Sequence, residues 1–127
     1  MNYRILIVDD SPLLRATARR AVLQAGAAPD NVREAKNGRE ALDALAKAPA
    51  DIVLLDINMP VMDGFEFVDQ KAKNPALAGV KGALVTTEGN KKRLDRMTQL
   101  GVVHYLRKPF EPEELRALVS ELFQEGK

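Results

Sequence analysis

Residues 51–64 read Asp51-Ile-Val-Leu-Leu-Asp56-Ile-Asn-Met-Pro-Val-Met-Asp63-Gly64. The apolar run at 52–55 has no polar alternation, which is typical of a strand covered on both faces in a parallel sheet. The run ends in a carboxylate, Asp56, and a proline turn follows. Ligands of open parallel sheets bind beyond the carboxyl ends of the strands. This stretch therefore predicts a central strand that delivers Asp56 to a binding site.

The flanking sequence alternates short apolar runs with segments of helical period. Strands are predicted at 4–8, 32–35, 52–55, 82–86 and 102–106. Helices are predicted to follow them at about 12–26, 38–47, 64–74, 90–100 and 111–123, and two of these begin with capping-box spacing, Asn37 with Glu40 and Asp63 with Glu66. Because crossovers between parallel strands are right-handed, this order predicts an α/β fold with helices on both faces of a parallel sheet.

Length and composition exclude several classes of protein. The 127 residues predict one domain over 1–127 with no output domain, and 46% hydrophobic with 29% charged residues predicts a globular fold. A formal net charge of +1 gives no reason to expect nucleic acid as a partner, and the absence of cysteine excludes disulfides. With no signal peptide or membrane span visible, we expect a cytoplasmic monomer without a membrane partner.

Polar residues gather where four of the predicted strands end. They are Asp9 and Asp10, Asp56, Thr86 and Thr87, and Lys108. In a parallel sheet these ends share one edge, where carboxylates a few ångströms apart repel by roughly 4 kcal/mol per pair at an effective dielectric constant of about 20. A divalent cation held by carboxylate oxygens, with Mg²⁺ as the common choice, would offset that repulsion. A carboxylate nucleophile, a cation, a lysine and a hydroxyl together predict phosphoryl transfer.

Five motifs, in order along the chain, resemble those of response-regulator receiver domains, specifically the stand-alone, CheY-like chemotaxis type. The resemblance covers the whole chain. The motifs are Ile-Leu-Ile-Val-Asp9-Asp10-Ser, Asn37-Gly38-x-Glu40-Ala-Leu, Leu-Leu-Asp56-Ile-Asn58-Met-Pro60-x-Met-Asp63-Gly64, Leu-Val-Thr86 and Tyr105-x-x-Lys108-Pro109-Phe110. Any one alone is a weak signal, whereas all five together are highly specific.

The resemblance implies a flavodoxin-like doubly wound (βα)5 fold with strand order 2-1-3-4-5. It implies that Asp56 accepts a phosphoryl group from a sensor histidine kinase. It also implies a Mg²⁺ cofactor bound by the carboxylates of Asp10 and Asp56, by the backbone carbonyl of Asn58 and, mainly through water, by Asp9. A protein of this kind is a phosphoacceptor and not an enzyme acting on outside substrates.

The resemblance also implies a switch. Thr86 would hydrogen-bond one phosphoryl oxygen, and Lys108 would pair with another. Tyr105 would swing inward when Thr86 moves and would change the surface of the fourth helix, fifth strand and fifth helix. That surface would bind a downstream target, for which the flagellar motor switch is a candidate. The bond from Lys108 to Pro109 is often cis in this family.

Three residues are expected to tune the loss of the phosphoryl group. Asn58 lies two residues beyond the acceptor and Glu88 two beyond the switch threonine, and either side chain would be able to orient an attacking water. Thr87 departs from the small residue common at its position. Its bulk would narrow access to the phosphoryl group, so the lifetime of the phosphorylated state stays open.

Each of these residues also fits a purely structural role when it is considered alone. Strand-end acids often cap helices, and Tyr105 would serve as a half-buried strand aromatic. The basic run Lys91, Lys92 and Arg93 fits either a solvated helix face or part of a partner-docking surface. The single histidine, His104, is assigned no role in phosphotransfer.

Two other functions stay open at this point. A phosphorelay carrier would pass the phosphoryl group on to a histidine phosphotransfer protein, and no residue of the chain argues against it. An aspartate-nucleophile phosphatase usually carries a second aspartate two residues after the nucleophile. Asn58 stands there and argues against that activity.

Overall fold

The computed structural model describes residues 3–102 and 104–125. Within these residues, short strands alternate with helices. The strands are β1 (Ile5–Val8), β2 (Val32–Ala35), β3 (Ile52–Leu55), β4 (Lys81–Thr86) and β5 (His104–Arg107). The α-helices are α1 (Pro12–Gln24), α2 (Gly38–Lys47), α3 (Gly64–Ala72), α4 (Lys91–Gln99) and α5 (Pro112–Glu125), and short 3-10 turns lie at Pro29–Asn31 and Pro75–Leu77.

The strands form one parallel sheet in the order β2-β1-β3-β4-β5. The register aligns Val8 of β1 with Leu55 of β3, and Leu55 with Leu84 of β4. The carboxyl ends of the central strands therefore lie at the same edge. This topology confirms the predicted flavodoxin-like, doubly wound fold.

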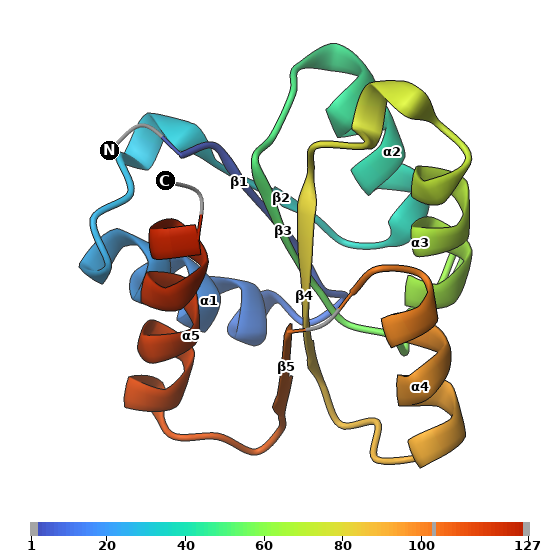
Figure 1. The fold of residues 1–127 in the computed structure, drawn as a ribbon. Helices are drawn as coiled ribbons and strands as arrows, with labels where there is room; N and C mark the ends of the chain where they lie inside the picture. The colour runs from blue at the N-terminus through green and yellow to red at the C-terminus, as the bar shows by residue number, and fades with distance from the viewer. Residues whose placement is uncertain (1–2, 103, 126–127) are drawn as a thin grey trace.

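Helices cover both faces of the sheet, with α1 and α5 on one face and α2, α3 and α4 on the other (Figure 1). All residues of β1 and β3 are buried, as the apolar runs predicted. Because successive strand side chains point to opposite faces, Ile5 and Ile7 join the core under α1 and α5, whereas Leu6 and Val8 join the core under the other three helices. Within the described chain, no helix has the length and apolar character needed to cross a bilayer.

Polar side chains start four of the helices where the sequence predicted starts. Each accepts the backbone N–H of the residue three positions later, at 2.9–3.3 Å. The capping residues are Ser11, Asn37, Asp63 and Asn90. The expected capping box at Asn37 differs in one bond, because the Glu40 carboxylate accepts the N–H of Lys36, one residue before the cap, at 3.1 Å.

Four strand boundaries differ from the prediction: β1 begins one residue later, at Ile5, β5 ends one residue later, at Arg107, and the starts of β4 and β5 also differ. Strand β4 begins one residue early, because the Lys81 N–H donates to the carbonyl of Asp51 at 2.9 Å and extends the ladder. Strand β5 begins at His104 and not at Val102. The Val102 N–H donates to the carbonyl of Met97 at 3.0 Å, so this residue closes α4 instead, and residue 103 lies outside the described residues.

Candidate functional site

Three carboxylates meet at the carboxyl edge of the sheet. Asp9 follows β1 and Asp56 follows β3, and the Asp56 N–H continues the ladder by donating to the carbonyl of Val8 at 3.1 Å. Asp9 and Asp56 are 6% and 7% exposed, whereas Asp10 is exposed. One carboxylate oxygen of each lies within 4.8 Å of the others. The fold therefore brings together the acids that the sequence placed at separate strand ends.

Lys108 lies against two of these acids. Its Nζ is 2.8 Å from Asp9 Oδ2 and 3.2 Å from Asp56 Oδ2, and its side chain is 9% exposed. The backbone N–H of Lys108 donates to the carbonyl of Thr86 at 2.8 Å, which attaches the end of β5 to the end of β4. The peptide bond from Lys108 to Pro109 is cis. A buried ammonium group thus bridges two buried carboxylates.

The charge of Asp9 is only partly compensated by its neighbours. Burial raises the pKa of Asp9, and the nearby negative charge of Asp56 adds to that rise. Hydrogen bonds from Lys108 and from the Ser11 N–H lower the pKa of Asp9, yet the net direction is upward. The hydrogen bonds to Asp9 therefore do not fully offset the cost of burying its charge.

The donor set fits Mg²⁺. This ion takes hard oxygen ligands at about 2.1 Å in an octahedron, which separates ligand oxygens by roughly 3–4 Å. The three carboxylate oxygens, within 4.8 Å of one another, are close to that spacing. Because Asp10 is exposed, the open side of the cluster leaves room for the waters that Mg²⁺ usually retains.

The end of β4 supplies a hydroxyl. Thr86 is fully buried, and its Oγ1 accepts the backbone N–H of Glu88 at 3.2 Å. Thr87, the next residue, is exposed. The Thr86 carbonyl is the acceptor of the Lys108 N–H, so the hydroxyl-bearing residue and the lysine belong to one hydrogen-bonded corner.

The two residues expected to orient a water lie in different surroundings. Asn58 is exposed next to the cluster, and its backbone N–H donates to Asp56 Oδ1 at 3.3 Å. Both oxygens of the Glu88 carboxylate already have partners at the start of α4. Its Oε1 lies 2.6 Å from Arg93 Nε, and its Oε2 accepts the N–H of Asn90 at 3.3 Å.

Tyr105 of β5 is 37% exposed, and its hydroxyl donates to the carbonyl of Glu88 at 2.6 Å. Glu88 therefore contacts both residues that the sequence assigned to the switch, Thr86 through its N–H and Tyr105 through its carbonyl. No pattern in the sequence indicates this double role.

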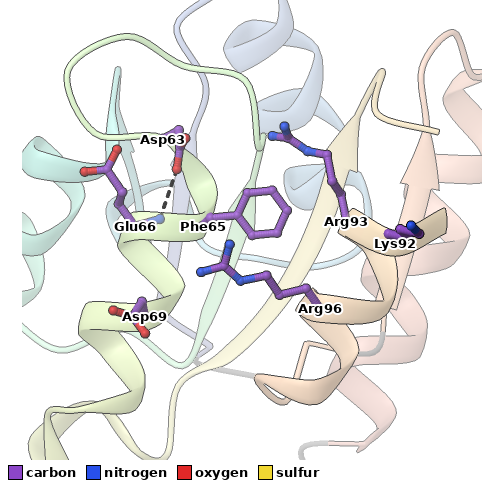
Figure 2. Close-up of a pocket in the computed structure, with 7 residues that line it drawn as sticks. All are labelled: Asp63, Phe65, Glu66, Asp69, Lys92, Arg93 and Arg96. Atoms are coloured by element: carbon purple, nitrogen blue, oxygen red, sulfur yellow. Dashed lines mark hydrogen bonds between the residues drawn. The ribbon is translucent and has the colours of Figure 1, made fainter. Parts of the chain in front are cut away.

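The basic run at the start of α4 divides into two parts. Lys91 and Lys92 are exposed. Arg93 turns toward α3, and its guanidinium lies 4.7 Å from the centre of the Phe65 ring, over which Arg96 also lies at 5.1 Å (Figure 2). These side chains line a groove of about 510 Å³ between α3 and α4, which does not include the carboxylate cluster. The acidic side of the groove consists of Asp63, Glu66 and Asp69, and Lys92 joins the two arginines on its basic side.

Sequence reasoning missed Arg15 as well as Phe65 and Arg96. Arg15 Nη1 donates to the carbonyl of Asp9 at 2.7 Å, and its Nε pairs with Glu34 at 3.1 Å. The helical period predicts the face on which Arg15 lies. Its partners, however, are Asp9, which follows β1, and Glu34, which lies in β2. Only the assembled sheet brings them within reach.

Comparison with known proteins agrees with this geometry. Residues 5–120 match the family model described as response regulator receiver domain. The chain is 32% identical to a chemotaxis protein CheY homolog of Campylobacter jejuni, with 97% of this chain and 94% of that protein covered. The solved structure of CheY4 of Vibrio cholerae has 33% identity and a TM-score of 0.85, with 96% of this chain and 99% of that chain covered.

A longer relative is also similar. The chain is 32% identical to the probable transcriptional regulator ycf29 of Porphyra purpurea, with 96% of this chain but only 57% of that protein covered. The chain thus spans little more than half of that relative. Taken together, the five-stranded parallel sheet, the family match and these relatives show that the chain belongs to the response regulator receiver domain family of two-component signalling.

Proposed function

We propose that this protein is a phosphorylation-dependent switch in which Asp56 accepts a phosphoryl group from a sensor histidine kinase. The observation that carries the proposal is the setting of Asp56. It is buried at the end of the central strand, 3.2 Å from Lys108 Nζ and within one carboxylate cluster with Asp9 and Asp10.

In the reaction, an Asp56 carboxylate oxygen attacks the phosphorus of a phosphohistidine. The new O–P bond forms as the N–P bond breaks, and the histidine leaves with the electron pair and takes up a proton. Asp9, Asp10, Asp56 and the Asn58 carbonyl would hold Mg²⁺, which when bound neutralises the charge on the phosphoryl oxygens. We propose no enzyme activity on outside substrates. Aspartate-nucleophile phosphatases usually carry a second aspartate two residues after the nucleophile, and this chain has Asn58 at that position.

Lys108 and Thr86 would recognise the transferred group. The lysine already lies against the acceptor oxygen and offers a positive charge to one phosphoryl oxygen. The Thr86 hydroxyl, whose oxygen now accepts the Glu88 N–H, would donate its hydrogen to another, and a shift of Thr86 toward that oxygen would displace Glu88 with it. The Tyr105 hydroxyl donates to the carbonyl of Glu88. A displacement of Glu88 would therefore move Tyr105 and change the surface formed by α4, β5 and α5.

That surface would bind the downstream partner. The exposed side chains of Lys91 and Lys92 border it and would add positive charge to the contact. The similarity to CheY proteins of Campylobacter jejuni and Vibrio cholerae supports a chemotaxis circuit, with the flagellar motor switch as the target. Transfer from Asp56 to a histidine phosphotransfer protein, measured directly, would instead indicate a relay carrier.

The test is incubation with acetyl phosphate and Mg²⁺, followed by intact mass spectrometry at acid pH. We expect wild type to gain the mass of one phosphoryl group only when Mg²⁺ is present. Asp56→Asn, which keeps the shape of the side chain without its nucleophilic charge, should gain nothing. Equal labelling of both proteins would refute Asp56 as the acceptor.

A further inference from the structure

Glu88 connects the loop between β4 and α4 to its neighbours through every polar group that it has. Its N–H and carbonyl bind Thr86 and Tyr105, as described above. Its carboxylate is held on both oxygens by α4, with Arg93 Nε 2.6 Å from Oε1 and the Asn90 N–H 3.3 Å from Oε2. The Glu88 side chain is 15% exposed and that of Arg93 44%, so water reaches this ion pair mainly from the arginine side.

Arg93 is itself held in place by a second element. Its guanidinium lies over the ring of Phe65, in the first turn of α3, and Figure 2 shows Arg93 reaching across from α4 to that ring. A cation over an aromatic face is favourable, and the ring limits the directions in which the guanidinium can turn. Arg93 therefore joins the β4–α4 loop to α3.

Phe65 is in turn fixed relative to the phosphoacceptor strand. Gly64, which precedes it, is packed so closely that an added Cβ would lie 2.7 Å from both the Asp56 carbonyl oxygen and the Ile57 Cα. The Gly64 N–H also donates to the Ile57 carbonyl at 2.8 Å. The position of Arg93 is thus set by the same segment that carries Asp56.

We propose that Arg93 is a positioning residue that holds the Glu88 carboxylate and thereby prolongs the life of the phosphoryl group on Asp56. The inference rests on the proposed function. In the hydrolysis that it restrains, a water oxygen attacks phosphorus, the bond from phosphorus to the Asp56 oxygen breaks, and the products are the free carboxylate and inorganic phosphate. The bonds from Arg93 and from the Asn90 N–H fix the direction of the Glu88 carboxylate, so it does not turn toward that water while they persist.

The chain offers a matched control for this inference. Arg96 lies over the same ring at 5.1 Å and on the same helix as Arg93. The two oxygens of Glu88, however, are taken by Arg93 and Asn90. Removing Arg96 therefore disturbs the groove and the stacking on Phe65 while leaving the ion pair on Glu88 in place.

The experiment measures the rate at which protein charged with acetyl phosphate loses its phosphoryl group in Mg²⁺ after the donor is removed. We expect Arg93→Met, which keeps an unbranched side chain over Phe65 without the charge, to lose the group roughly fivefold faster, a modest effect for a carboxylate that assists water. Arg96→Met should stay within about twofold of wild type, and Arg93→Lys, which keeps the cation, should restore most of the wild-type lifetime.

A double variant shows whether the effect passes through Glu88. Arg93→Met combined with Glu88→Gln should lose the group no faster than Glu88→Gln alone. If the double variant is as fast as Arg93→Met, or if Arg93→Met matches Arg96→Met, the inference is wrong. Arg93→Gln provides a second removal of the charge should the methionine variant fold poorly. Wild type that takes up no phosphoryl group would overturn the proposed function and this inference together, whereas normal charging with an unchanged lifetime in Arg93→Met overturns the inference alone.

Discussion

Two residues at the acidic edge of the sheet are in energetically unfavourable states: Asp9 carries a buried carboxylate and Val61 has a strained backbone. Lys108 neutralises part of the charge of Asp9 and Asp56, yet the pKa of Asp9 stays raised because burial outweighs its hydrogen bonds. In the loop after Asp56, Val61 has a positive φ of 72°, which is rare for a β-branched residue. Such costs are common around functional sites, where the surrounding fold imposes them.

The strain at Val61 predicts a stabilising substitution. Val61→Asn should raise the free energy of unfolding by about 1 kcal/mol, because asparagine tolerates the left-handed region better. The Val61 side chain is 78% exposed, so little buried apolar surface is lost. Urea unfolding measures the change. Val61→Thr keeps the branched Cβ and is the control, and an equal gain in that variant would show that polarity, not backbone conformation, is responsible.

At the scale of elements, the loop that follows β3 is packed directly against the strand it leaves. Gly64 begins α3 where an added Cβ would lie 2.7 Å from backbone atoms of Asp56 and Ile57, and its N–H donates to the Ile57 carbonyl at 2.8 Å. At the opposite end of the sheet, the side chain of Asp51 accepts the backbone N–H of Arg4 at 2.8 Å and pairs with its guanidinium at 3.1 Å, which joins the beginnings of β1 and β3.

The packing at Gly64 predicts a large effect from one methyl group. Gly64→Ala should lower the free energy of unfolding by about 2 kcal/mol, because the added carbon meets backbone atoms that cannot move cheaply. Gly79→Ala is the matched control, since a Cβ there meets nothing within 4 Å, and it should change stability by less than about 0.5 kcal/mol. Similar losses in the two variants would argue against the close packing of α3 on the acceptor strand.

The pair of Asp51 and Arg4 predicts a pH dependence. Hydrogen bonds from the Arg4 side chain lower the pKa of Asp51, with smaller contributions from the Arg4 N–H and charge, against a rise from burial. A lowered folded-state pKa gives stability that is present above the ordinary carboxyl range, about pH 4, and is lost as the pH falls through the folded-state value. Asp51→Asn should therefore destabilise at pH 7, by less than about 1 kcal/mol because water screens the pair.

Urea unfolding of wild type and Asp51→Asn across the acid range measures this dependence. The difference between the two proteins should shrink toward zero below the folded-state pKa. Asp43→Asn removes the acid of a more exposed pair, in which Arg39 and Asp43 side chains are 68% and 64% exposed, and should have a smaller effect at pH 7. A difference for Asp51→Asn that grows as the pH falls would contradict the assigned direction.

At the scale of the whole molecule, one edge of the sheet collects the residues on which the proposed function depends. Strands β1, β3, β4 and β5 each deliver a polar residue to it, and the helices on both faces keep the rest of each strand dry. Because the carboxylate cluster exists only in the folded chain, a cation that binds it must stabilise the fold as a whole.

This linkage predicts the response to Mg²⁺. At a concentration 100-fold above its Kd, Mg²⁺ should stabilise wild type by about 2.7 kcal/mol, which corresponds to a rise in Tm of roughly 10 °C for a domain of this size. Asp10→Asn should lose most of that rise, and EDTA should reverse it in wild type. Sodium chloride at the same ionic strength is the control for screening, and equal shifts in wild type and Asp10→Asn would contradict the site.

The sequence by itself determined the fold and which residues meet at the carboxyl edge of the sheet. The unbroken apolar run before Asp56 is typical of a strand covered on both faces, and parallel strands end at one edge, so Asp9, Asp10, Asp56 and Lys108 were predicted to meet. The sequence placed the strand boundaries less exactly, because the start of β4 and the end of α4 depend on single backbone hydrogen bonds, from Lys81 to Asp51 and from Val102 to Met97.

Only the tertiary structure decided which side chains pair across elements. Arg93 contacts Glu88 and Phe65 and so joins α4 to the β4–α4 loop and to α3, elements that no local pattern relates. The basic run at 91–93 did not show which of its three residues would make these contacts. The physical reason is that hydrophobic periodicity specifies which face of an element is buried, whereas the partner of a long polar side chain depends on how neighbouring elements are spaced and turned once the core has packed.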